Sequence, residues 1–121
     1  MDDTISIKEL KEIIKKFRDE RDWKQFHDAK NLAEAISIEA AELQELFLWK
    51  NVDEINNKIK NEPEYRKKIE YELSDVITFA LNLANTLDID VAKTITEKIK
   101  INNKRYPVDK ARGTADKYDK L

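Results

Sequence analysis

The amino-acid sequence predicts an all-α fold in which four to five helices pack as a bundle. The 121 residues include only one Gly and two Pro, too few for the turns and bulges of a β-rich domain. Apolar residues recur at spacings of three, four and seven, without sustained alternation. Capping residues precede these stretches. The length favours a single domain over residues 1–121.

The first two helices are expected near Ser6–Asp19 and Asn31–Trp49. Ser6 and Glu9 have the spacing of a capping box, and Asn31 is the expected cap of the second helix. Each helix has one apolar face. The two faces comprise Leu10, Ile13, Ile14 and Phe17, and Leu32, Ile36, Leu43, Leu46 and Phe47.

Three further helices are expected near Asn51–Lys60, Pro63–Leu87 and Val91–Tyr106. Asn51 and Asn61 each stand three residues before a Glu, as capping residues do, and Asp90 can cap the last helix. Pro107 would stop that helix. The remaining residues, 107–121, are rich in charge and are expected to form a mobile C-terminal tail.

Composition excludes several classes of protein. The 23 basic and 25 acidic residues are interspersed, which is not the footprint of a protein that binds a nucleic acid polymer. The absence of Cys excludes disulfides, iron–sulfur clusters and thiol catalysis, and one His excludes sites with several His ligands. The sequence has neither a membrane span nor a signal peptide, so we expect a cytoplasmic protein with no membrane partner.

The small apolar fraction predicts self-association. Only 40% of the residues are hydrophobic, and a small polar domain buries a modest core. Because contact between copies would add buried surface, we expect a homo-oligomer.

Two pairs of carboxylates interrupt the apolar faces. On a helical wheel, Glu39 lies about 20° from the centre of its apolar stripe, and Glu42 lies on the shoulder. Glu72 lies between Phe79 and Leu83 on another helix, and Asp75 stands three residues further on. Both pairs therefore point at or along the expected core.

Buried carboxylates need compensation by Lys or Arg, by protonation, or by a hard divalent cation such as Mg²⁺ or Mn²⁺. The i, i+3 spacing lets each helix offer two carboxylates to one ion. A single pair is weak evidence, since Glu9 and Glu12 share that spacing without any catalytic implication. A di-iron bundle is disfavoured, because it uses repeated Glu-x-x-His motifs.

Polar and aromatic residues elsewhere could bind a ligand. Lys98, Asn102 and Arg105 share one helical face, which could bind an anion or could simply be solvated. Trp23, His27 and Trp49 flank the second helix, where such side chains either stack on a base or close a core.

The order of these motifs resembles the MazG-like nucleotide pyrophosphohydrolases, most of all their small dCTP pyrophosphatase branch. The resemblance extends from about Ser6 to the C-terminus. It is carried by ERDWKQFH (residues 20–27), EAAELQELFLW (39–49), EYELSDV (70–76), KIKINNKRYPV (98–108) and KARGTADKY (110–118).

The resemblance implies an all-α NTP pyrophosphatase fold with interlocked subunits, as a homotetramer built as a dimer of dimers or as a homodimer. It implies Mg²⁺-dependent hydrolysis of a (deoxy)nucleoside triphosphate, such as dCTP or a modified dCTP, to the monophosphate and pyrophosphate. The implied metal ligands are Glu39, Glu42, Glu72 and Asp75. The implied nucleotide-binding residues are Trp23, His27, Trp49, Phe79, Lys98, Asn102 and Arg105.

The residues and the resemblance fit one mechanism, in which Glu42 or Glu45 orients the attacking water. Two departures leave the base preference open: Phe79 and Leu48 stand where relatives have Tyr and Gln. Hydrolysis of dUTP or another nucleotide is one alternative. A non-catalytic helical oligomerisation module with a structural metal is another.

Overall fold

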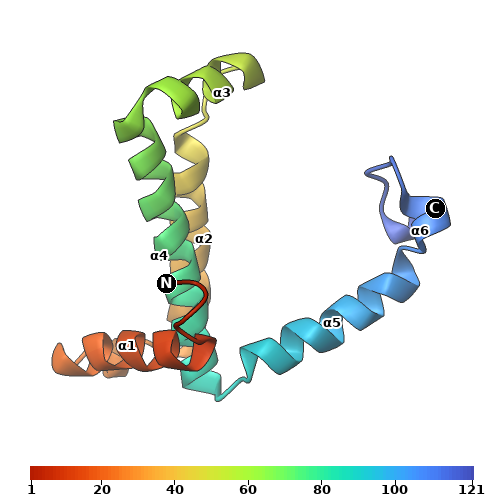
Figure 1. The fold of residues 1–121 in the computed structure, drawn as a ribbon. Helices are drawn as coiled ribbons and strands as arrows, with labels where there is room; N and C mark the ends of the chain where they lie inside the picture. The colour runs from red at the N-terminus through yellow and green to blue at the C-terminus, as the bar shows by residue number, and fades with distance from the viewer. The chain divides into compact units, whose positions relative to one another are not determined.

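The computed structural model describes all 121 residues and contains helices but no strands (Figure 1). The prediction of an all-α fold is therefore confirmed. The helices are α1 (Ile7–Glu20), α2 (Ala29–Glu45), α3 (Val52–Asn61), α4 (Pro63–Leu87), α5 (Val91–Arg105) and α6 (Val108–Ala111), with short 3-10 helices η1 (Lys24–Phe26) and η2 (Tyr118–Lys120). None of these helices combines the length and the apolar character needed to cross a membrane.

Side-chain caps start three helices where the sequence predicts them. At α1, the Glu9 amide donates to Ser6 Oγ at 3.1 Å and the Ser6 amide donates to Glu9 Oε2 at 2.6 Å, which completes the capping box. Asn51 accepts from the Glu54 amide at the start of α3. Asp90 caps α5 in the same manner.

Two other helix starts differ from the prediction. Helix α2 begins earlier, because Asp28 Oδ1 accepts from the Asn31 amide at 2.8 Å. Asn31 thus lies inside the first turn, and its own side chain donates to the Phe26 carbonyl. Glu62, rather than Asn61, precedes α4, since Pro63 occupies the first helical position, where its fixed φ and missing N–H are tolerated.

Helix α2 also ends before the predicted Trp49. The helix stops at Glu45, and a turn follows in which Trp49 has a φ of 62°. A residue in this left-handed region cannot continue a right-handed helix. The Tyr65 hydroxyl donates to the Leu46 carbonyl at 2.6 Å, which satisfies one carbonyl that has lost its helical partner.

The chain forms two compact units, Met1–Asp88 and Ile89–Leu121. In the first unit, α2 and α4 lie side by side, with α1 across one end and α3 across the other (Figure 1). The two long helices are antiparallel, because Thr86 near the end of α4 donates to the His27 carbonyl just before α2. This pairing places the middle of α2 beside the middle of α4.

The first unit has a small buried core and leaves large apolar side chains uncovered. Its buried apolar residues are Leu32, Tyr65, Leu81 and Ala84. Two polar side chains, Arg18 and Asn82, are buried with them. The large apolar side chains of helix α1 lie on one face, yet Ile13 and Phe17 remain 56% and 50% exposed.

In the second unit, the C-terminal residues contact the end of α5. The Tyr118 ring lies edge-on to Tyr106, with ring centroids 6.1 Å apart. The Arg105 guanidinium lies 4.7 Å from the centre of the Tyr118 ring. Residues 107–121, for which the sequence favours a mobile tail, thus contain α6 and η2 and pack their terminal aromatic residue against α5.

Candidate functional site

Three carboxylates meet where α2 and α4 lie side by side. Glu39 comes from α2, and Glu72 and Asp75 come from successive turns of α4. One oxygen of each carboxylate lies within 4.8 Å of the others. The i, i+3 spacing on α4 and the antiparallel pairing of the helices together create this group, which we call the carboxylate trio.

Two oxygens of the carboxylate trio are buried without a partner. Glu39 Oε2 and Glu72 Oε2 have no hydrogen-bond donor, although Asp75 is exposed. An unpaired buried carboxylate oxygen is costly, because it has given up its hydration without gaining a protein partner. The trio therefore contains unsatisfied negative charge.

The pKa values of Glu39 and Glu72 show the same conflict. Burial, together with the neighbouring charges of Glu42, Asp75 and Glu72, raises the pKa of Glu39 to about 7. The pKa of Glu72 is also raised, first by burial and then by Glu42 and Asp75. Bringing these carboxylates together thus favours either a retained proton or a bound cation.

Glu42 and Glu45 lie beside the trio on α2 and are both exposed. Glu42 raises the pKa of both Glu39 and Glu72, and Glu45 contributes to the raised pKa of Glu72. The structure therefore brings all five predicted acidic residues into one neighbourhood. Glu42 lies next to the closest group rather than within it.

The donor set fits a hard divalent cation. The trio supplies only oxygen atoms, which Mg²⁺ and Mn²⁺ prefer. No Lys or Arg forms an ion pair with any of its members, so the basic compensation considered from the sequence is absent. The two unpartnered oxygens provide ligand atoms whose burial a cation would compensate.

A chain of aromatic rings leads away from the trio along α4. The rings of Trp23 and His27 have centroids 6.1 Å apart, and those of His27 and Phe79 are 6.3 Å apart. Phe79 follows Asp75 by about one helical turn. Two of the three residues predicted to hold a base, Trp23 and His27, thus lie together with Phe79 at one end of the trio.

Trp49 is not part of this cluster within the chain. It lies just beyond α2 and is 93% exposed, and the neighbouring Phe47 packs on Tyr65. Tyr65 and Phe79 are fourteen residues apart on the same helix, or about 21 Å. His27 and Trp49 therefore lie towards opposite ends of α4.

The remaining predicted ligands are on α5, in the second unit. Lys98 and Arg105 are exposed, whereas Asn102 is half-buried. Their spacing places them on one face of the helix, as predicted. Arg105 is in contact with the Tyr118 ring.

Sequence reasoning missed two buried polar residues beside His27. The Asn82 side chain contacts the imidazole, with Nδ2 and His27 Nδ1 2.6 Å apart. Arg18 is also buried, and its charge, after burial itself, lowers the pKa of His27. A signal for Asn82 existed: it stands seven residues after Asp75 on the same wheel that identified the carboxylates.

Comparisons with known proteins agree with this fold. The MazG-like family matches residues 35–121. Over 116 residues, which are 96% of this chain and 68% of the relative, the chain is 36% identical to dCTP pyrophosphatase 1 of Rattus norvegicus. It is 35% identical to dCTP pyrophosphatase 1 of Homo sapiens over the same shares.

A solved structure has the same architecture. The crystal structure of a pyrophosphatase from Archaeoglobus fulgidus superposes with a TM-score of 0.75 and 36% sequence identity. The match covers 83% of this chain and 91% of the archaeal chain. Fold, site and comparisons together define an all-α enzyme of the pyrophosphohydrolase class. The chain belongs to the MazG-like family.

Proposed function

We propose that the protein hydrolyses a deoxynucleoside triphosphate, dCTP or a modified dCTP, to the monophosphate and pyrophosphate with Mg²⁺, or Mn²⁺ as a substitute. The observation that carries this proposal is the carboxylate trio of Glu39, Glu72 and Asp75 with its two unpartnered buried oxygens. The names of the relatives support dCTP as the first substrate to test. Clearing unwanted nucleotides from the cellular pool, in the cytoplasm, is the role that we assign to this activity.

In this proposal the acidic residues have two tasks. Glu39, Glu72 and Asp75, joined by Glu42, would hold the metal, which when bound supplies charge neutralisation for the phosphates and a more acidic water. An exposed carboxylate, Glu45 or Glu42, would accept a proton from the water that attacks the α-phosphorus. The bond to the β-phosphate oxygen then breaks, and pyrophosphate leaves.

The aromatic residues would hold the base. Phe79 stands one turn from Asp75, or about 6 Å along α4, which leaves room for a sugar between phosphate and base. Trp23 and His27 continue this surface. Because Phe79 has no hydroxyl, it can contact the nucleotide only through its ring.

The basic face of α5 would bind the phosphates. Lys98 and Arg105 can neutralise the departing pyrophosphate, and Asn102 can donate to the phosphates or the sugar. We further propose that residues 1–121 work as a single domain. Its C-terminal segment contains two further basic residues, Arg112 and Lys117, which can neutralise phosphate charge.

A second copy of the chain would complete the site. Within one chain, Trp49 and His27 are separated by most of the length of α4, which is too far for both to touch one base. Trp49 is almost fully exposed, and α1 has an uncovered apolar face. We therefore propose a homodimer, or a homotetramer built as a dimer of dimers, in which Trp49 reaches the nucleotide of a neighbouring copy.

A nucleotide panel tests the activity. The purified protein is incubated with Mg²⁺ and dCTP, 5-methyl-dCTP, dUTP or dATP, and pyrophosphate and phosphate are measured separately. We expect pyrophosphate and monophosphate, fastest from dCTP or 5-methyl-dCTP. Preference for dUTP or dATP would overturn the substrate assignment alone. No turnover of any nucleotide, with thermal stabilisation by metal alone, would instead favour a structural module.

A further inference from the structure

Helix α4 holds His27 at two points. The Asn82 side chain contacts the imidazole through Nδ2 and Nδ1, 2.6 Å apart. One turn further along, Thr86 Oγ1 donates to the His27 carbonyl at 3.1 Å. Asn82 therefore contacts the imidazole ring of His27, whereas Thr86 binds the backbone carbonyl of the same residue.

Stability does not explain the presence of Asn at position 82. The residue is 3% exposed, and its Oδ1 is buried without a donor. A buried unpaired carbonyl costs more than one neutral hydrogen bond returns. The neighbours Leu81 and Leu83 show that an apolar side chain would suit this part of the helix, so the amide needs another explanation.

The contact determines which nitrogen of His27 carries the proton. Neutral imidazole has one donor and one acceptor nitrogen. Asn82 Nδ2 can only donate, so its 2.6 Å contact with His27 Nδ1 is a hydrogen bond when Nδ1 accepts, which in the neutral ring places the proton on Nε2. Burial and, after it, the charge of Arg18 lower the pKa of His27, and both effects favour the neutral ring.

We propose that Asn82 is a positioning residue that fixes His27 as the Nε2–H tautomer, so that the ring offers one N–H donor to the nucleotide. The group recognised is a hydrogen-bond acceptor on a pyrimidine base, either a carbonyl oxygen or an unprotonated ring nitrogen. The ligand rests on the proposed function, whereas the tautomer rests on the Asn82 contact alone. Asn82 does not itself touch the nucleotide.

The tautomer can be measured directly, because His27 is the only histidine in the chain. With ¹⁵N-labelled protein at pH 8, we expect NMR shifts of the Nε2–H form. Asn82→Leu should give a mixture of forms, and Asn82→Asp should favour Nδ1–H, since a carboxylate accepts from this nitrogen. The matched control Thr86→Val should keep the wild-type tautomer. A wild-type ring protonated on Nδ1, or a ring unchanged in both Asn82 variants, would overturn the proposal.

Kinetics then distinguishes positioning from general support of the fold. For Asn82→Leu we expect KM for the best nucleotide of the panel to rise about fivefold to tenfold, with kcat changed less than threefold. Its thermal midpoint should equal or exceed that of the wild type. In a His27→Ala background the same substitution should have no further effect on KM. An equal effect with and without His27 would overturn the positioning role.

The two proposals can fail separately. If the wild type hydrolyses no nucleotide, the proposed function fails, and the NMR comparison still decides whether Asn82 sets the tautomer. If nucleotides are hydrolysed but His27 keeps its tautomer in both variants, the role of Asn82 fails while the proposed function stands.

Discussion

The hydroxyl of Tyr65 donates a hydrogen bond to the backbone oxygen of Leu46, at 2.6 Å. The two residues are nineteen positions apart in the sequence, and they join the first turn of α4 to the end of α2. The Leu46 carbonyl lies where α2 has ended and has no partner of its own within the helix. The Tyr65 side chain therefore joins the start of α4 to the end of the antiparallel helix α2.

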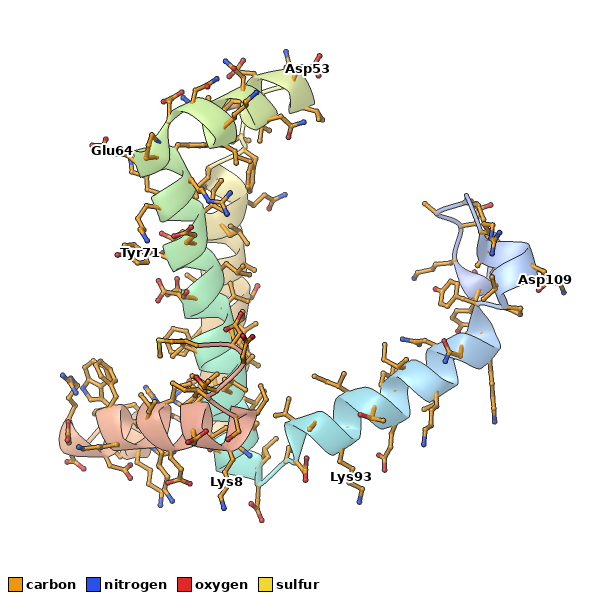
Figure 2. The ribbon with its side chains drawn as sticks, viewed as in Figure 1. Lys8, Asp53, Glu64, Tyr71, Lys93 and Asp109 are labelled. Atoms are coloured by element: carbon orange, nitrogen blue, oxygen red, sulfur yellow. The ribbon has the colours of Figure 1, made fainter.

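Replacing Tyr65 by Phe should lower the free energy of unfolding by about 1 kcal/mol, because a half-buried carbonyl loses its donor while the ring is kept. Urea unfolding measures this change. Tyr71→Phe is the matched control, since Tyr71 is 63% exposed and lies on the side of α4 away from α2 (Figure 2). Equal effects in both variants would show that the Leu46 contact has no special role.

Replacing Glu39 by Gln should lower the rate of Mg²⁺-dependent pyrophosphate release by about 100-fold or more. The helix content measured by circular dichroism should stay unchanged. The substitution keeps the shape of the side chain and removes one anionic member of the trio. Glu34→Gln is the control, because Glu34 is on the same helix but pairs with Lys30 at the surface. Full activity of Glu39→Gln would contradict the assignment of the metal site.

Stability should depend on pH through Glu39. Its pKa is about 7 in the folded chain, above its ordinary value of 4.5, so folding favours the protonated form. The metal-free protein should therefore lose stability as the pH rises from about 4.5 to about 7, and little beyond. Since Mg²⁺ must displace the proton, its stabilising effect should grow across the same interval.

Thermal unfolding at pH 5.5 and pH 8, with and without millimolar Mg²⁺, measures both effects. We expect Mg²⁺ to raise the midpoint by roughly a few degrees more at pH 8 than at pH 5.5. Glu39→Gln should remove most of this difference. The same Mg²⁺ effect at both pH values in the wild type would show that binding does not compete with a proton on Glu39.

Replacing Trp49 by Ala should raise KM more than it lowers kcat, because the ring would position the base without taking part in the reaction. If a neighbouring copy supplies Trp49, mixing this variant with Glu39→Gln should restore activity. Mixed oligomers would contain one site with both residues intact. The measurement is made at substrate concentrations below KM after the subunits have been allowed to exchange. Activity no greater than the sum of the separate variants would place both residues in the same chain.

Periodicity predicted the helices well because each apolar face extends over several turns. The capping box of Ser6 and Glu9 was also readable, since both partners are close in the sequence. The end of α2 cannot be predicted from the sequence, because it depends on the left-handed backbone of Trp49 and on a hydrogen bond from Tyr65. Such contacts between distant segments leave no local pattern.

In the candidate site, too, local patterns could be predicted from the sequence, whereas contacts between distant segments could not. Glu39 and Glu72 could be found because carboxylates on an apolar stripe conflict with their surroundings, and the structure brings them together with Asp75. The contact of Asn82 with His27 depends on how a loop packs against α4, so the sequence gives no direct sign of it. Trp49 and His27 both flank α2 in the sequence, which suggests a shared site, but a helix places its two ends far apart.

The regular rise and rotation of α4 set the spacing of the residues along the site. Glu72, Asp75, Phe79 and Asn82 follow one another at intervals of three, four and three, so they share one face. One residue inserted after Asp75 would turn the later pair by about 100° and separate the two groups. Seven inserted residues would restore the face but move the groups about 10 Å further apart. An insertion or deletion in this stretch would therefore disrupt the arrangement as directly as a substitution of one of these side chains.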